Sequence, residues 1–79
     1  MTRAAFRAVL EEILSVDPGS LRDTDSRQTI EGWSSIVDVQ IMAFVSSELG
    51  LEEEAEMLSF ESIGELLDTL ERRGALTSV

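Results

Sequence analysis

Two adjacent serines carry the hydroxyl groups of greatest chemical interest in this chain. Ser34 and Ser35 follow Gly32-Trp33 and precede Ile36-Val37-Asp38-Val39, so that a turn glycine and an aromatic residue lead into an apolar helix. A hydroxyl at a helix start can accept hydrogen bonds from the unpaired N–H groups there. It can also be esterified to a phosphate that those N–H groups and the helix dipole stabilise. The first role is structural and the second is functional, and both remain open at this point.

The composition limits which chemistry the chain could perform. It contains neither cysteine nor histidine. A Ser-His-Asp triad, a Cys-His pair and the common nitrogen- or thiolate-ligand metal sites are therefore excluded within this chain. No N-terminal stretch resembles a signal peptide and none approaches the length of a membrane span, while the lack of disulfides is compatible with a reducing compartment. We expect a cytoplasmic protein with no catalytic residue and no metal ligand.

Charge is distributed unevenly along the 79 residues, which carry a net charge of −10. All six basic residues are arginines, and none lies between Gln28 and Glu71, a segment that holds eleven carboxylates. Such a field repels nucleic acids and anionic lipid headgroups and favours partners with basic surfaces. We therefore expect no binding to nucleic acid or membrane. The acidic surface either keeps the protein soluble or docks basic partners, and the charge pattern leaves both possibilities open.

Two segments have the spacing of amphipathic or buried helices. The first runs from about residue 2 to 15, and its apolar side chains recur at helical intervals: Phe6, Val9, Leu10, Ile13 and Leu14. The second runs from Ser35 to Leu49, is apolar over more than half of its circumference, and is followed by Gly50 as a left-handed C-terminal cap. This second segment should be the central helix of the fold.

The rest of the chain completes an all-α architecture. Asp17-Pro18-Gly19 ends the first helix, and the polar stretch that follows, to Trp33, predicts a long crossover loop. Residues 52–58 predict one short helix. Ser62 and Glu65 form a capping box that begins a last helix, which fades at 72–74. The expected fold is a small bundle of three main helices plus one short helix. It forms a single domain, residues 1–79, with 75–79 as a flexible tail.

The serine segment resembles the modification site of acyl and peptidyl carrier proteins. That family's usual pattern is Gly-Trp or Gly-Xaa, then Asp-Ser-Leu, then a helix, and here it reads Gly32, Trp33, Ser34, Ser35, Ile36. The stretch from Leu58 to Leu66 also looks like the family's approach to its last helix. Together with the order of the helices, the resemblance covers the chain from about Phe6 to Leu70.

The resemblance implies a substrate carrier rather than an enzyme. A phosphopantetheinyl transferase would move phosphopantetheine from coenzyme A to Ser35, and the thiol of this arm would hold acyl or aminoacyl groups as thioesters. The expected setting is polyketide, nonribosomal peptide or related specialised biosynthesis. Expected partners of the monomer are this transferase and acyl-loading and acyl-processing enzymes with basic surfaces. The residues implied in partner contact are Ile36, Asp38, Ala43 and Glu48.

One position departs from the family pattern, because Ser34 replaces the usual aspartate before the attachment serine. Ser35 could be modified with Ser34 tolerated, or it could require a dedicated transferase. Alternatively, the chain is an unmodified acidic adaptor that binds a basic partner, or an unrelated bundle in which both serines cap a helix. Attachment at Ser34 is a further alternative. Trp33 is expected to pack beneath the preceding loop, although it could instead shield the arm or contact a partner.

Overall fold

Helix α1, Arg3–Leu14, forms from the first amphipathic segment in the computed structural model, which describes residues 1–51 and 60–77. It begins where the Thr2 hydroxyl accepts a hydrogen bond from the Ala5 N–H at 3.0 Å. It ends at Ser15, whose left-handed backbone conformation (φ 58°) directs its N–H back to the carbonyls of the last turn. The helix therefore ends within one residue of the predicted end at residue 15, just before the Asp17-Pro18-Gly19 turn.

Helix α2, Ser35–Glu48, and helix α4, Ile63–Arg72, correspond to the other two predicted main helices. Gly50 has the left-handed conformation expected after α2, with φ 69°. At the start of α4 the Ser62 hydroxyl accepts a hydrogen bond from the Glu65 N–H at 3.3 Å. In a capping box the Glu65 carboxylate would accept a hydrogen bond from the N–H of the N-cap residue Ser62. Here it accepts from the N–H of the preceding residue, Glu61. The predicted short helix at 52–58 lies outside the described residues.

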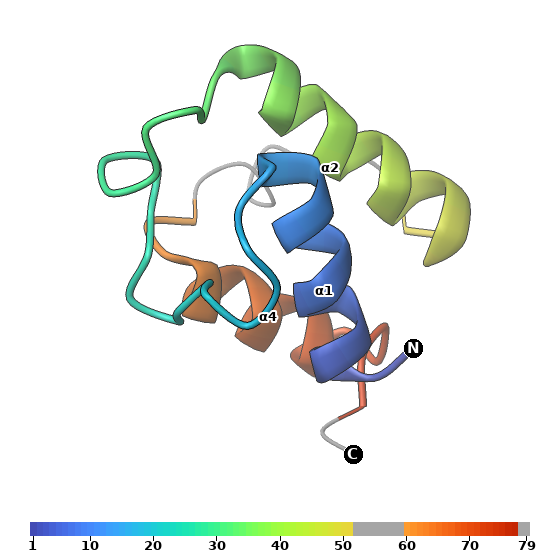
Figure 1. Cartoon of the computed structure of the whole chain (residues 1–79). Helices are drawn as coiled ribbons and strands as arrows, with labels where there is room; N and C mark the ends of the chain where they lie inside the picture. The colour runs from blue at the N-terminus through green and yellow to red at the C-terminus, as the bar shows by residue number, and fades with distance from the viewer. Residues whose placement is uncertain (52–59, 78–79) are drawn as a thin grey trace.

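The three helices enclose one hydrophobic core, and the described residues contain no β-strand. In Figure 1, α2 crosses one end of α1 while α4 lies near its other end. The predicted all-α bundle is thus confirmed. Each helix contributes fully or nearly fully buried side chains, including Phe6, Leu10, Ile41, Val45, Leu66, Leu67 and Leu70. Burial of one such side chain stabilises the fold by about 1.5–3 kcal/mol, so this core is the main source of stability.

The long loop between α1 and α2 is anchored at several points. Leu21 is buried, and its N–H donates to the Glu11 carboxylate of α1 at 3.1 Å. Farther along, the carbonyls of Asp25 and Asp23 accept hydrogen bonds from the first two N–H groups of α4, those of Ile63 and Gly64, each at 2.9 Å. The loop therefore caps α4 and connects it with α1.

A buried carboxylate shapes the middle of this loop. Asp25 is 4% exposed and accepts hydrogen bonds from the Arg22 N–H at 2.8 Å and from the Thr29 hydroxyl at 3.0 Å. The backbone hydrogen bond from Arg22 lowers the pKa of Asp25, and the Thr29 hydroxyl adds to this effect against the opposing cost of burial. Asp25 thus stays ionised inside the loop and holds the turn that presents its own carbonyl to α4.

The expectation of a flexible tail from residue 75 is wrong for residues 75–77. Leu76 is 3% exposed and belongs to the core. Thr77 forms a parallel β-bridge with Thr2, in which the Arg3 N–H donates to the Thr77 carbonyl at 2.8 Å. The segments around Thr2 and Thr77 consequently lie side by side, as Figure 1 also shows. Burial of Leu76, packing of Ala75 against the core and the backbone hydrogen bonds between Thr77 and the N-terminal residues together offset the entropy cost of ordering this segment.

Candidate functional site

The two adjacent serines occupy different positions at the start of α2. Ser34 is the N-cap residue with an extended backbone, and Ser35 is the first helical residue; both are exposed. The Ser34 carbonyl accepts hydrogen bonds from the N–H groups of Val37 at 3.0 Å and Asp38 at 3.3 Å. Its hydroxyl forms no cap hydrogen bond. The structural role that the sequence left open for Ser34 is therefore not observed, and the Ser35 hydroxyl lies at an uncapped helix start.

Asp38, one turn into α2, is partly buried and paired within the molecule. Its Oδ1 accepts hydrogen bonds from the Trp33 Nε1–H at 2.9 Å and from the Arg27 Nη2–H at 3.0 Å. Arg27 Nε lies 3.2 Å from the same oxygen. Because this charge is neutralised within the domain, Asp38 contributes to holding the helix start and little to a surface charge that a partner could contact.

Trp33 packs as the sequence favoured, although with partners that the sequence did not indicate. The indole is half-buried against Phe60, with ring centroids 5.9 Å apart, and the Arg27 guanidinium lies 5.3 Å from the indole centroid. Arg27 lies 4.4 Å from the Phe60 centroid and donates from Nη1 to the Phe60 carbonyl at 2.9 Å. These four residues, Arg27, Trp33, Asp38 and Phe60, are called the arginine clamp below.

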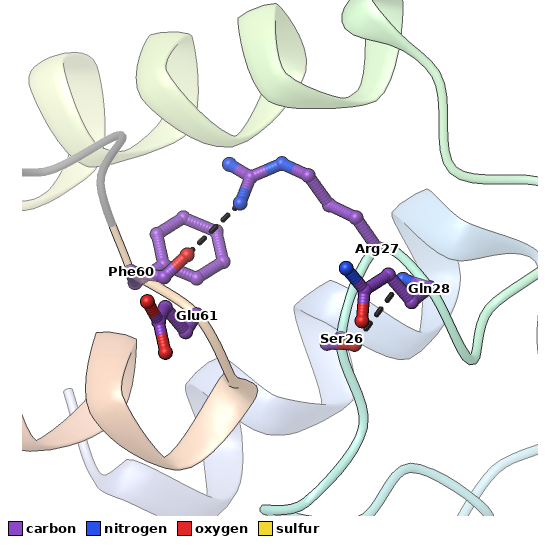
Figure 2. A pocket seen from close by; sticks show the side chains of 5 residues that line it. All are labelled: Ser26, Arg27, Gln28, Phe60 and Glu61. Carbon is purple, nitrogen blue, oxygen red and sulfur yellow. Dashed lines mark hydrogen bonds between the residues drawn. The ribbon is translucent and has the colours of Figure 1, made fainter.

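A polar pocket of about 360 Å³ adjoins the arginine clamp. Figure 2 shows its lining, in which Ser26, Arg27 and Gln28 come from the loop and Phe60 and Glu61 from the segment before α4. Arg27 reaches across the pocket to the Phe60 carbonyl. The clamp thus joins two segments that are 33 residues apart in sequence.

The remaining residues expected in partner contact are exposed on α2. Ile36 is 68% exposed, and Ala43 and Glu48 are exposed as well. Val39, on the same helix, is 67% exposed. Ile36, Val39 and Ala43 follow at intervals of three and four residues and share one face of the helix next to the serines. This face is an apolar surface of the kind that contacts other proteins.

A second apolar feature lies between α1 and α2. A shallow groove of about 530 Å³ is lined by Val9, Glu12 and Ile13 from α1 and by Gln40, Ala43, Phe44 and Ser47 from α2. Its floor includes Phe44, which is half-buried and packs on Phe6 with ring centroids 5.7 Å apart. Ala43 lines the groove and also belongs to the exposed apolar face of α2, so the two features adjoin.

Arginines from outside the arginine-free segment neutralise part of its acidic surface. Arg27 pairs with Asp38, and Arg3 pairs with Asp68 at 2.7 Å and Glu71 at 2.8 Å. The hydrogen bond to Asp68, followed by that to Glu71, raises the pKa of Arg3. Glu48, in contrast, forms no ion pair with any described residue. The unpaired acidic charge that remains on α2 therefore lies near its C-terminal end.

Three further findings limit what this site could be. No group of three or more potential metal ligands occurs in residues 1–51 and 60–77. Within the same ranges, no helix has both the length and the hydropathy needed to cross a bilayer. Comparison of the chain with protein-family models, with curated proteins and with solved structures finds no match. The geometry around Ser35 is therefore the basis for a functional conclusion.

Proposed function

We propose that this chain is an acyl or peptidyl carrier protein that bears a phosphopantetheine arm on Ser35. One observation carries the proposal: Ser35 is an exposed hydroxyl residue at the first position of a long helix whose N-cap side chain makes no hydrogen bond. A phosphodiester on this hydroxyl would lie where the helix dipole and the unpaired N–H groups favour negative charge. Ser34 would be a weaker candidate, because its residue precedes the helix.

The chemistry requires a separate transferase. The Ser35 oxygen would form a new phosphoester bond while the pyrophosphate bond of coenzyme A breaks, the adenosine bisphosphate half leaves, and the hydroxyl proton passes to the transferase or solvent. The terminal thiol of the arm then supplies the thioester chemistry that a chain without cysteine cannot provide. The carrier's own contribution is to hold the cargo at high local concentration near successive enzymes.

Docking of those enzymes would use the exposed face of α2. Ile36, Val39 and Ala43 offer apolar contact beside the attachment serine, and Glu48 offers an unpaired negative charge. Partners with an apolar depression and a basic rim fit this surface. Such a carrier belongs in polyketide, nonribosomal peptide or related biosynthesis, where carriers pass intermediates between enzymes.

The second candidate is an acidic adaptor without a prosthetic group. It is favoured by the same exposed residues, Ile36 and Val39, because they would serve protein contact whether or not Ser35 is modified. The two candidates differ in one respect only, which is the chemistry at the serine.

Attachment of the arm tests the proposal directly. The protein is incubated with coenzyme A and a broad-specificity phosphopantetheinyl transferase, and its intact mass is measured. We expect the mass of one arm to be gained by the native chain and by Ser34→Ala, and to be lost in Ser35→Ala. Both variants should keep their helix content in circular dichroism, since neither hydroxyl makes a cap hydrogen bond. No gain in the native chain with any transferase would favour the adaptor, and loss in Ser34→Ala alone would move the attachment site to Ser34.

A further inference from the structure

Arg27 connects three segments that are distant in sequence. From the long loop, its Nε and Nη2 lie 3.2 and 3.0 Å from Asp38 Oδ1 in the first turns of α2. Its Nη1 donates to the Phe60 carbonyl, before α4, at 2.9 Å, a contact visible in Figure 2. The planar guanidinium group has donors pointing in several directions, which makes arginine suited to bridge two acceptors at once.

The clamp is also shielded from water on two sides. The Arg27 guanidinium lies against the rings of Phe60 and Trp33, and the Trp33 indole donates to the same Asp38 oxygen that Arg27 binds. The side chains of Arg27 and Asp38 are 33% and 28% exposed. Hydrogen bonds between charged groups are shorter and stronger than neutral ones, and partial burial reduces their screening by salt. The Arg27–Asp38 pair therefore fixes the position of the Asp38 side chain.

The start of α2 depends on such an anchor. Ser34 provides no side-chain cap, so the first turn lacks the interaction that usually limits fraying. Asp38 lies one turn after the two serines, and its N–H donates to the Ser34 carbonyl at 3.3 Å. Holding the Asp38 side chain thus holds the turn that follows Ser34 and Ser35.

We infer that Arg27 is a positioning residue for Ser35. By fixing the first turn of α2, the clamp determines which of two adjacent, exposed and chemically identical hydroxyls is presented as the first helical residue. The functional half of this inference rests on the proposed attachment of the arm, whereas the structural half does not. Arg27 touches neither serine and acts through Asp38.

Amide exchange and fluorescence test the structural half without any modification. In Arg27→Gln, exchange of the Val37 and Asp38 amides, measured by NMR, should be faster by roughly tenfold, the factor that corresponds to losing a hydrogen bond to a charged group. Amides at the centre of α4 should exchange as in the native chain. Trp33 is the single tryptophan of the sequence, so its emission should shift as its contact with Arg27 is lost.

Two further variants keep this test interpretable. Arg22→Gln removes the same charge from the same loop at an arginine that pairs with Asp25 at 3.6 Å and not with Asp38. It should leave exchange of the Val37 and Asp38 amides and the Trp33 emission unchanged. Asp38→Asn preserves an acceptor for the Trp33 indole while removing the charge that pairs with Arg27. It should accelerate exchange of the Val37 amide and of the amide at position 38 as Arg27→Gln does. It therefore tests the clamp independently if Arg27→Gln folds poorly. Unchanged exchange at Val37 and Asp38 in both clamp variants would overturn the inference.

The choice between serines tests the functional half. After reaction with transferase and coenzyme A, peptide mapping should find the arm only on Ser35 in the native chain and in Arg22→Gln. Arg27→Gln should show a measurable share on Ser34, or a lower kcat for transfer with little change in KM, and Arg27→Lys should restore part of the native behaviour. Native site choice and native rate in Arg27→Gln would show that the clamp is only structural. If the native chain takes no arm, the proposed function fails, while exchange and emission still decide whether the clamp fixes the helix start.

Discussion

Asp38 shows how tertiary contacts change the role of a single residue. In sequence it belongs to a long acidic segment without arginine or lysine, and this favours a surface charge available to basic partners. In the fold its carboxylate is paired with Arg27 and accepts a hydrogen bond from Trp33. Replacement of Asp38 would therefore disturb the helix start as well as the surface charge, so Asp38 is unsuitable as a probe of docking.

At the same scale, Ser34 provides a prediction about the missing aspartate. Ser34→Asp places a negative charge at the N-terminus of α2, where it is stabilised by the dipole by about 0.3–1 kcal/mol. Its carboxylate could also accept a hydrogen bond from the nearby N–H groups that the serine leaves unused. We expect a higher urea midpoint and, under the proposed function, faster transfer of the arm to Ser35.

Ser34→Asn separates these two effects, because asparagine caps a helix without adding charge. If Ser34→Asp and Ser34→Asn raise stability equally and only the aspartate speeds transfer, the transferase responds to the charge. Efficient modification of the native chain at a rate that Ser34→Asp does not change would show that the serine is a neutral replacement. Failure of Ser34→Asp with every transferase tried would favour the adaptor.

The elements are held together by backbone contacts as much as by their apolar faces. Helix α4 receives two carbonyls from the long loop at its first N–H groups, which would otherwise lack partners. Gly64 favours this close approach, because a Cβ at that position would lie 3.1 Å from Asp23 Cβ and 3.3 Å from the Asp23 carbonyl oxygen, so the loop would have to shift slightly. The loop is further held there by the ion pair of Asp23 with Arg7.

This close contact predicts the effect of Gly64→Ala. In an exposed helix, alanine is more favourable than glycine by about 1 kcal/mol. Here we expect the opposite sign, a loss of about 1 kcal/mol in the free energy of unfolding, because the loop must move away from α4 to admit the methyl group. Urea denaturation measures the change. Gly32→Ala, where an added Cβ meets nothing within 4 Å, is the control, and a gain in stability at Gly64 would refute the prediction.

For the whole molecule, the arrangement of charge is more informative than the net value of −10. Arg3 connects α1 with Asp68 and Glu71 of α4, and Arg27 neutralises Asp38, so arginines near the N-terminus balance carboxylates near the other elements. The pairs of Arg3 with Asp68 and Glu71, whose carboxylates are 62% and 36% exposed, contribute little stability individually. Glu48 forms no ion pair with any described residue and keeps its charge on the surface of α2.

Docking of the transferase should therefore depend on salt and on Glu48. Because exposed charges are screened beyond about 10 Å at 0.1 M salt, the KM for the carrier should rise with ionic strength. Glu48→Gln should raise KM more than Asp17→Asn, which removes an equal charge at an exposed residue after α1 that lines neither the groove nor the exposed face of α2. Equal effects of the two variants, or a KM independent of salt, would show that the acidic surface serves solubility alone.

Local pattern determined the helices of this protein. The periodic apolar residues of α1 and α4, the cap at Ser62 and the left-handed Gly50 act over a few residues. The sequence alone was therefore sufficient to predict them and to place Ser35 at the start of α2. The all-α fold follows from the same signals.

Tertiary packing decided what local pattern could not. Helix α2 carries apolar side chains on most of its circumference, so its own sequence does not indicate that Val39 faces solvent while Ile41 is buried. The positions of α1 and α4 determine this. No spacing rule connects Arg27 with Phe60, 33 residues away, or predicts that Leu76 returns to the core. Such contacts depend on how the folded chain brings distant segments together, and the helix start that bears Ser35 is held by one of them.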